Sequence, residues 1–307
     1  MIISMHRNIT SNQKGEWNSI LEMIGSKDIF YTNEYMRFFE NERDMKAEMF
    51  IFQEGKDVAA YPYLKKQETS GISITSERYG GPISNTMDPG FIKRFQDCFM
   101  KFRSDSMIKN EQYIMHPFLA FMSGNGETRK VGSLAYVDLS KDEDALWSGM
   151  RKYHKRRIRD SVGMTVTFSE DLSGLKGFYG LYEDNMRRAG ATESVLDFDY
   201  LKSLASVMKG YFEMVNVIFA GEVIASTFVL RSMPFVYFCY GGQSWEHNKL
   251  QPKHFQIYHS MLAYKKRGYR YMVLGSGRRM GTNDSLMAFK TGFSNDIVNV
   301  YEYRSRT

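Results

Sequence analysis

The sequence predicts an α/β protein built from two tandem copies of one domain, each a mixed sheet flanked by helices. The first observation behind this prediction is a hairpin pattern in residues 217–242. Two runs of apolar, β-branched and aromatic residues, 223–230 and 235–240, are separated by a turn around Met233-Pro234. The second observation is that an earlier part of the chain repeats this pattern. The third is the length of 307 residues, which is enough for two domains with their own cores.

The repeat consists of two pairs of matching segments. Residues 54–64 align without a gap on residues 220–230, so the offset from residue 54 to residue 220 is 166. Tyr79-Gly80-Gly81 matches Tyr240-Gly241-Gly242, so the offset from residue 79 to residue 240 is 161. Two ordered matches at nearly one offset favour duplication over chance, and a period this long indicates a duplicated domain rather than a solenoid. We therefore expect domains at residues 1–139 and 140–307.

The composition is that of a soluble globular protein, with 43% hydrophobic and 25% charged residues. No apolar run approaches the roughly 20 residues that span a bilayer, and the N-terminus lacks the apolar core of a signal peptide, so we expect a cytoplasmic protein without a transmembrane segment. Cys98 and Cys239 are expected to be reduced core residues, and no zinc-ligand spacing exists, so no metal is expected. The net charge of +6 indicates a mild preference for anionic partners.

The first domain is expected to begin with two short helices and three strands, at residues 12–24 and 33–39 and at residues 49–53, 58–64 and 72–78. Pro62 lies inside the second strand and predicts an edge or a bulge there, because proline cannot donate a ladder hydrogen bond. A helix is predicted from Asp88, with a core-facing aromatic stripe at Phe91, Phe95, Phe99 and Phe102. Strands at residues 112–116 and 133–138 complete the domain, and His116 is interpreted as structural.

One helix is predicted across the joint between the domains, from Ser140 to about Ser161. Ser140 followed by Glu143 matches a capping box. The second half of this helix is basic, with Arg151, Lys152, His154, Lys155, Arg156, Arg157 and Arg159 within nine positions. Cations are favoured near a helix C-terminus, but like charges this dense repel one another at i,i+4. The pattern therefore favours an anion site over a solvated basic face.

The second domain is expected to contain strands at residues 164–168, 211–219, 223–230, 235–240 and 269–274, and helices at residues 175–188, 198–209 and 252–267. Pro252 in the first turn and Gly268 after the end mark the last of these helices. The strand at 269–274 is followed by Gly275-Ser276-Gly277, a basic loop that includes Arg278, and a segment with the pattern Phe-Lys-x-x-Phe at residues 289–293.

These motifs resemble a known family. A hairpin ending in Tyr-Gly-Gly and followed by a helix is similar to the GNAT acyltransferase half-domain. Two such halves in tandem, with the glycine-rich strand end, basic loop and Phe289-Lys290 pattern, resemble the FemABX-type aminoacyltransferases and their acetyltransferase-like relatives, which include BioF2-like acetyltransferase domains. The family usually carries an acidic residue at the position of Val273, so any role of that carboxylate is absent or displaced here.

The resemblance implies a set of site residues. Lys290 would stabilise the negative charge that develops on the acyl carbonyl or its leaving oxygen, and Phe289 would shape the pocket. A lysine lying over the core with its head in water is the alternative interpretation. Lys155, Arg156 and Arg159 match the basic pattern that helps hold the phosphates of a nucleotide-linked wall precursor, and Tyr240 and Arg278 complete the expected substrate-binding set. No residue pair identifies a general base.

Three functional hypotheses remain open. The first is an N-acyltransferase that moves an aminoacyl group from aminoacyl-tRNA to an amine of a cell-envelope precursor or related metabolite. The second is an acyl-CoA-dependent N-acetyltransferase acting on an amino sugar. Against this hypothesis, residues 251–256 lack the glycines of a loop that binds the pyrophosphate of CoA. In a variant binding mode, Lys253 or His254 would serve as the charge partner of the pyrophosphate. The third is a non-catalytic module that binds RNA or a phosphoglycan. Both enzymatic hypotheses imply a phosphate-bearing amine acceptor and an acyl donor that is a co-substrate, so no cofactor is expected.

Overall fold

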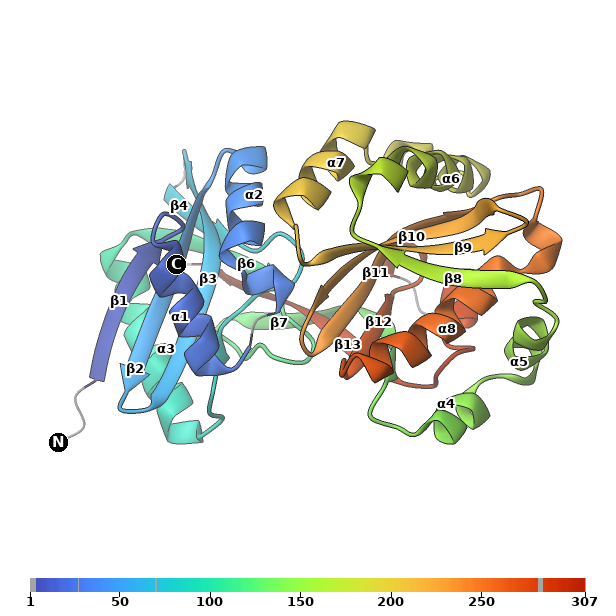
Figure 1. Cartoon of the computed structure of the whole chain (residues 1–307). Helices are drawn as coiled ribbons and strands as arrows, with labels where there is room; N and C mark the ends of the chain where they lie inside the picture. The colour runs from blue at the N-terminus through green and yellow to red at the C-terminus, as the bar shows by residue number, and fades with distance from the viewer. Residues whose placement is uncertain (1–3, 27, 70, 281–283, 307) are drawn as a thin grey trace. The chain divides into compact units, whose positions relative to one another are not determined.

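The computed structural model describes residues 4–26, 28–69, 71–280 and 284–306 (Figure 1). The chain divides into two compact units. Unit 1 comprises Met1–Gly132 and Asn299–Thr307, and unit 2 comprises Ser133–Val298. Each unit has a mixed sheet with helices on its faces, as the sequence predicts, but the division differs from the predicted boundary after residue 139.

The sheet of unit 1 follows the order β1-β2-β3-β4-β6-β13, with β5 also paired to β3. Its strands are β1 (Ser4–Thr10), β2 (Lys46–Glu54), β3 (Asp57–Glu68), β4 (Gly71–Thr75), β5 (Ile83–Ser84), β6 (Ile108–Ile114) and β13 (Ile297–Arg306). β4 and β6 are parallel, and the other pairs are antiparallel. The sequence pattern did not predict β1 or β13, the strands nearest the two ends of the chain.

Helices cover both faces of this sheet. They are α1 (Lys14–Ile24), the short η1 (Ile29–Tyr31), α2 (Asn33–Arg43) and α3 (Pro89–Asp105). Phe50 and Phe52 of β2 pack in one core with the predicted aromatic stripe of α3. Met49 and Ile51 are also buried, and because side chains alternate along a strand they point to the other face, where α1 and α2 contact β3.

Pro62 lies in β3, which is not an edge strand of the sheet. It faces Met49 of β2 on one side. On the other side, β5 pairs with residues 59 and 60 and β4 pairs with residues 64–68. Pro62 therefore falls in the interval between two partners, where the ladder is interrupted. The predicted edge is wrong for the strand as a whole, but the missing proline N–H coincides with a local break in pairing.

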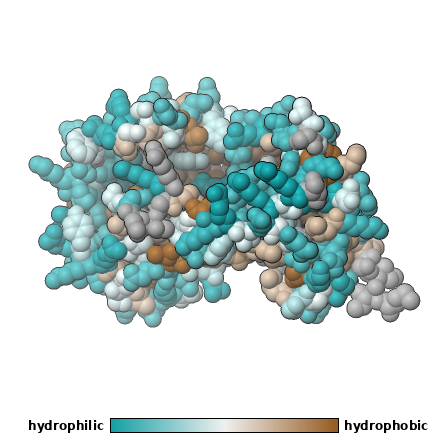
Figure 2. All heavy atoms as spheres, turned by 180° about the vertical axis from the view of Figure 1, so that it is seen from behind, coloured by the Kyte–Doolittle hydropathy of each residue, from teal (hydrophilic) through white to brown (hydrophobic). Residues whose placement is uncertain are grey.

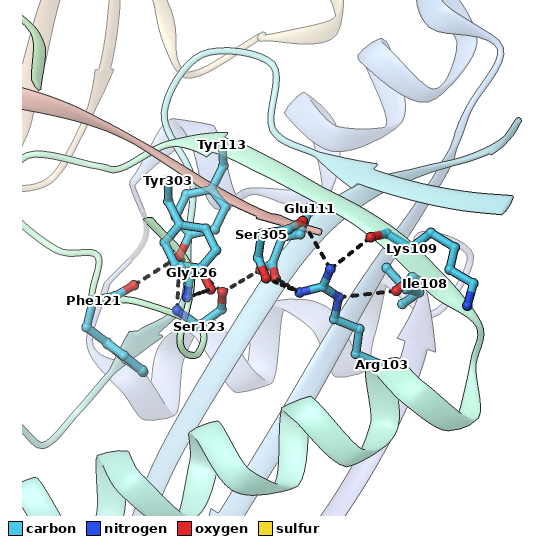
Figure 3. A network of polar contacts seen from close by, with 10 residues as sticks. All are labelled: Arg103, Ile108, Lys109, Glu111, Tyr113, Phe121, Ser123, Gly126, Tyr303 and Ser305. Carbon is cyan, nitrogen blue, oxygen red and sulfur yellow. Dashed lines mark hydrogen bonds and ion pairs between the residues drawn. The ribbon is translucent and has the colours of Figure 1, made fainter. Parts of the chain in front are cut away.

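A buried network explains why the last strand belongs to unit 1 (Figure 3). Arg103 of α3 is 1% exposed, and its guanidinium forms an ion pair with Glu111 of β6 at 3.2 Å. The same guanidinium donates to the Ser305 hydroxyl at 2.6 Å and to the Ser305 carbonyl at 3.0 Å. Glu111 also accepts a 2.5 Å hydrogen bond from Ser123. β13 thus satisfies buried donors of unit 1, although all but its first two residues follow unit 2 in the sequence.

The sheet of unit 2 follows the order β7-β12-β11-β10-β9-β8. Its strands are the end of β7 (Glu127–Asp138), β8 (Met164–Ser169), β9 (Phe212–Phe219), β10 (Glu222–Ser232), β11 (Phe235–Gln243) and β12 (Tyr271–Gly275). β10 and β11 form the predicted hairpin, with Ser232 paired to Phe235 across Met233-Pro234. β11 and β12 are parallel.

Unit 2 contains six α-helices among its described residues, and Figure 1 shows α6 and α7 on one face of its sheet and α8 on the other. The helices are α4 (Glu143–Gly149), α5 (Lys152–Arg159), α6 (Leu175–Arg188), α7 (Phe198–Val207), α8 (Pro252–Lys266) and α9 (Ser285–Lys290). Short 3-10 helices are η2 (Leu172–Gly174), η3 (Thr192–Ser194), η4 (Asn248–Leu250) and η5 (Arg278–Met280). The main core lies between α8 and the strands, where Met261 and Tyr264 belong to one buried cluster with Val215, Val229 and Met272.

The single helix predicted from Ser140 to about Ser161 is wrong. Met150 and Arg151 adopt extended backbone angles and separate α4 from α5. The predicted capping box is also wrong, because Asp142 rather than Ser140 accepts the hydrogen bond from the Ala145 N–H, at 2.7 Å. The Ser140 hydroxyl instead donates to Asp138 at 2.6 Å. A closer carboxylate acceptor has displaced the serine from the capping position.

The two predicted repeats correspond to equivalent hairpins, with one difference in register. Glu54 pairs with Asp57 at the β2–β3 turn, and Phe219 pairs with Glu222 at the β9–β10 turn. Gly55 is therefore the first residue of its turn, whereas Gly221 is the second residue of its turn. The gap-free alignment of the sequences is off by one position at this point.

The surface in Figure 2 is mostly hydrophilic, with small apolar patches. No helix within the described ranges is long and apolar enough to cross a membrane.

Candidate active site

A cavity of about 600 Å³ opens in unit 2 beside the point where β11 and β12 part. The two strands pair only through Phe235–Tyr237 and Tyr271–Val273. Beyond this point β11 bulges at Cys239, since Tyr240 pairs with Phe228 and Phe238 pairs with Val229 of β10. Residues of β10, β11, β12, α6, α8 and α9 line the cavity. No aspartate or glutamate is among the described residues that line it.

The equivalent strands of unit 1 do not part in this way. β4 and β6 remain paired from Ile72 to Thr75, and Gly80 continues the parallel pairing with Met115. Gly80 belongs to the Tyr-Gly-Gly segment of the first repeat, which matches Tyr240-Gly241-Gly242 at the cavity. Of the two matching pairs of strands, one is therefore closed and the other, in unit 2, is open.

α9 brings Phe289 and Lys290 to the cavity wall. Asp284 caps this short helix by accepting from the Met287 N–H at 2.8 Å. The Lys290 ammonium donates to the Ser276 carbonyl, just after β12, at 2.7 Å. The Phe289 ring packs perpendicular to the His254 ring of α8, with ring centroids 5.0 Å apart. A fixed positive charge and an aromatic wall thus face the same cavity.

α5 holds α9 in place through side chains of the basic run that predicted an anion site. The Arg151 guanidinium donates to the Ala288 carbonyl at 3.0 Å and to the Thr291 hydroxyl at 3.2 Å. His154 Nε2 donates to the Phe289 carbonyl at 2.9 Å. The last carbonyls of a helix have no partner within it. Here the Gly292 N–H donates to the Phe289 carbonyl at 3.1 Å, and the two members of the basic run add further donors at the end of α9. The sequence offered no sign of this role beyond their i,i+3 spacing.

α8 contributes a second lysine and a histidine. The Lys253 ammonium lies 2.7 Å from the Thr227 hydroxyl, 2.9 Å from Gln256 Oε1 and 2.9 Å from the Ser226 carbonyl. Burial lowers the pKa of Lys253 to about 7. Burial, followed by the charges of His154 and Arg157, lowers the pKa of His254 to about 4, so that its imidazole is neutral at pH 7.

Comparison with known proteins places these features in a family. Residues 148–290 match the family model described as an acetyltransferase (GNAT) domain. Unit 2 carries a GNAT acyltransferase domain. The matched segment runs from α4 to the last residue of α9, so it includes every residue of the cavity wall. A search of curated proteins finds no match.

Solved structures share the fold of the whole chain. The crystal structure of FemX has a TM-score of 0.76 at 12% identity, with 99% of this chain and 97% of that chain covered. The C-terminal domain of a putative lysylphosphatidylglycerol synthetase from Agrobacterium fabrum has a TM-score of 0.55 at 14% identity, covering 94% and 93%. A tandem GNAT protein from the clavulanic acid biosynthesis pathway has a TM-score of 0.52 at 10% identity, covering 98% and 98%. The predicted fold of two tandem GNAT-like domains is confirmed and is shared with FemX, and the chain is an acyltransferase with a GNAT domain at residues 148–290.

The GNAT domain brings three of the predicted site residues together. Lys290, Phe289 and Tyr240 all line the cavity, and the Tyr240 ring packs against Tyr182 of α6 and Phe228 of β10. Their catalytic and binding roles stay predictions, because a position on the wall does not establish a function.

The other predicted residues lie away from the cavity wall. Lys155 donates to the Ser148 carbonyl at 3.3 Å, the Arg156 guanidinium lies over the Tyr153 ring, and the Arg159 guanidinium lies over the Trp147 ring. Arg278 is exposed in η5. None of the four is among the residues that line the cavity. A role for them in substrate binding also stays a prediction. Conversely, Thr227 and Gln256 were not singled out from the sequence, where no motif marks them.

The start of α8 bears on the acyl donor. The Gln251 N–H donates to the Asn248 carbonyl and the His254 N–H donates to the Gln251 carbonyl, each at 3.0 Å. Pro252, between them, has no N–H. Lys253 directs its ammonium inward to Ser226 and Thr227. Few backbone donors at this helix end are therefore available to an external pyrophosphate.

Proposed function

We propose that this chain transfers an aminoacyl group from aminoacyl-tRNA to an amine of a phosphate-bearing cell-envelope precursor or a related metabolite. Acylation of an amine places negative charge on the carbonyl oxygen, and a positioned cation in an enclosed site stabilises that charge. Lys290 has this position on the cavity wall, with its ammonium held by the Ser276 carbonyl. Thus the cavity of the GNAT domain is the place where the acyl carbonyl would react.

The observation that carries the choice of donor is the start of α8. A pyrophosphate of CoA needs a row of unpaired backbone N–H groups at this helix end. Here one of them is missing at Pro252 and two others already donate within the chain. An acyl donor without a pyrophosphate at this position, such as the aminoacyl ester of a tRNA, does not need this row of N–H groups. The shared fold of FemX and of the lysylphosphatidylglycerol synthetase domain supports the same choice.

The test is a comparison of donors with one enzyme preparation. The chain is incubated with tRNA charged with labelled amino acids, or with labelled acetyl-CoA, together with a panel of UDP-linked amino sugars and UDP-linked peptides that carry a free amine. We expect label to pass from tRNA to an acceptor as an alkali-stable amide, and not from acetyl-CoA. Transfer from acetyl-CoA alone would overturn the assignment of the donor.

Matched variants connect the transfer to the cavity. Lys290→Ala removes the cation at the wall and is expected to slow transfer by about a hundredfold or more. Lys265→Ala is the control, because Lys265 lies on α8 but donates to the carbonyls of Leu139 and Lys141, away from the cavity. Equal activity of the two variants would place the reaction elsewhere in the chain.

The second candidate is an acyl-CoA-dependent N-acetyltransferase acting on an amino sugar. It is favoured by the matching family model, which is described as an acetyltransferase domain. The tandem GNAT protein of the clavulanic acid pathway, whose structure was solved without AcCoA, has the same fold. Thermal stabilisation of the chain by CoA or acetyl-CoA, accompanied by release of free thiol during turnover, would favour this candidate over the first.

A further inference from the structure

Lys253 belongs to a closed hydrogen-bond network at the wall of the cavity. Its ammonium contacts three oxygens at 2.7 to 2.9 Å: Ser226 O, Thr227 Oγ1 and Gln256 Oε1. The Thr227 hydroxyl and Gln256 Oε1 are 2.8 Å apart. Gln256 is fully buried, and its Nε2 donates to the Val215 carbonyl at 2.6 Å, which directs Oε1 toward Lys253. Both Thr227 and Lys253 line the cavity.

This network satisfies Lys253 in either protonation state. As an ammonium, Lys253 donates its three N–H groups to the three oxygens, and the Thr227 hydroxyl donates to Gln256. As a neutral amine, it donates two N–H groups to Ser226 and Gln256, and its lone pair accepts from the Thr227 hydroxyl. Apart from the proton on Lys253, the two hydrogen-bond arrangements differ only in the rotation of the Thr227 hydroxyl. No buried donor or acceptor of the network is left without a partner in either one, so neither state carries the penalty of an unsatisfied group.

We propose that Lys253, acting through the Thr227 hydroxyl, accepts the proton that the attacking amine loses during acyl transfer. The amine nitrogen forms a bond to the acyl carbon and passes one proton to Thr227 Oγ1, while the Thr227 proton moves to Lys253 Nζ. The carbonyl carbon then releases its leaving oxygen, or sulfur for a thioester, and Lys253 returns the proton to that atom through the same hydroxyl. The acceptor amine loses one proton and the leaving group gains one, so Lys253 and Thr227 return to their initial protonation states. The role rests on the proposed amine acceptor.

The surroundings of Lys253 favour exchange of its proton near neutral pH. The titratable groups that share the cavity wall with it are Tyr182 of α6, Cys239 and Tyr240 of β11, His254 of α8 and Lys290 of α9. None of these is a carboxylate, so no anion on the described wall holds the lysine in its charged form. Burial accordingly lowers the pKa of Lys253 to about 7. A proton acceptor works best when its pKa is close to the operating pH.

The first experiment needs no substrate. The full chain is labelled with ¹³C at lysine Cε, and its NMR shifts are followed from pH 5 to pH 11. We expect one lysine signal to titrate near pH 7 and to disappear in Lys253→Met. Lys265→Met, on the same helix, is the control and should leave the signal that titrates near pH 7 in place. A Lys253 signal that titrates above pH 9 would overturn the proposal. Since no acyl donor is used, this result is independent of the proposed function.

The second experiment separates proton transfer from a structural role. Thr227→Val keeps the side-chain shape but removes the hydroxyl, and Thr227→Ser restores it. With the donor that proves active, Thr227→Val should lose about a hundredfold in kcat, with KM changed little and the acidic limb of the kcat–pH profile flattened. Thr227→Ser should keep both the rate and the profile. If Thr227→Val has the same pH profile as Thr227→Ser, Lys253 does not act through this hydroxyl and the proposal fails.

Discussion

His154 Nε2 lies 2.9 Å from the carbonyl oxygen of Phe289, and this hydrogen bond joins α5 to the end of α9. The two residues are 135 positions apart in the sequence. Phe289 precedes Lys290, so the bond fixes the backbone next to the cation at the cavity wall. Arg151 strengthens the same link through the Ala288 carbonyl. The basic segment before β8 therefore fixes the position of α9 at the candidate active site, although Arg151 and His154 do not line the cavity themselves.

We predict that His154→Phe lowers both stability and turnover. The ring still packs against Phe293, but the Phe289 carbonyl loses one of its two donors and keeps the Gly292 N–H at 3.1 Å, so we expect a loss of about 1 kcal/mol, the net contribution of one hydrogen bond. Urea unfolding and initial rates measure the two effects. His6→Ala, at an exposed position of β1, is the control and should change neither. Unchanged turnover in His154→Phe would mean that α9 is positioned without this bond.

Lys290→Met should lower kcat/KM by about a hundredfold to a thousandfold, because it removes a preorganised charge and keeps the aliphatic stem. Lys290→Arg should keep part of the activity. Circular dichroism and melting temperature check that the fold is intact in both. The alternative interpretation, a lysine that only covers the core, predicts that Lys290→Met retains the full rate.

The predicted anion site on α5 is tested by Lys155→Ala, Arg156→Ala and Arg159→Ala combined. If these side chains bind phosphates, the triple variant weakens tRNA or acceptor binding. For a duplex ligand, the slope of log affinity against log salt then falls by about 0.9 for each phosphate that is no longer neutralised. The control combines Lys176→Ala, Lys202→Ala and Lys209→Ala, three exposed lysines of the same unit, and removes the same charge. Equally weakened binding in the two triple variants would indicate nonspecific attraction only.

Stability should fall as the pH drops from about 6.5 to about 4. The folded protein lowers the pKa of His254 to about 4, whereas an unfolded histidine titrates near 6.5. Between these values the unfolded chain binds more protons, so stability rises with pH and is lost on acidification. The effect of His254 is on the order of 3 kcal/mol at most, and His154 and His259 shift in the same direction.

Urea unfolding at pH 7, 5.5 and 4.5 measures this slope in the wild type and in His254→Phe. The variant cannot take up a proton at this position, so its stability should depend less on pH over this window. The carboxylates contribute equally to both proteins and cancel in the comparison. Parallel profiles would show that His254 does not titrate differently in the folded and unfolded states.

Arg103→Met should destabilise the protein by about 3 to 5 kcal/mol, because it leaves Glu111 buried without its cation. It also removes the donors to Ser305 and so loosens β13. The control is Arg129→Ala, since the Arg129 side chain is 71% exposed and its ion pair with Glu302 should contribute less than about 1 kcal/mol. Chemical denaturation measures both. Similar losses of stability in the two variants would contradict the buried network as a determinant of unit 1.

Much of the fold could be predicted because it depends on local pattern. The aromatic stripe of α3 and the β10–β11 hairpin have strong periodicity, and the structure contains both. The strands β1 and β13 were missed because they are short or polar and gain their stability from partners far away in the chain. The break between α4 and α5 was missed for a related reason. Extended backbone at Met150 and Arg151 lets Arg151 reach α9, and no local signal in the helix pattern requires it.

The candidate site was predicted in part. Lys290, Phe289 and Tyr240 were found through motifs, and all three line one cavity. The Lys253 network was not found, because Thr227, Gln256 and Lys253 are ordinary residues of a strand and a helix whose meeting depends on how α8 packs against β10.

By itself, the sequence determined the kind of fold and its duplication, since hydrophobic period and turn residues are local properties that a chain carries before it folds. Only the tertiary structure decided which copy is open. β4 and β6 stay hydrogen-bonded in unit 1, whereas β11 and β12 part in unit 2 and leave room for a ligand. The same tertiary packing decided which of the many cationic side chains face the cavity. The direction of a side chain depends on the register of its strand or helix and on the contacts of its neighbours, not on its position in a run of basic residues.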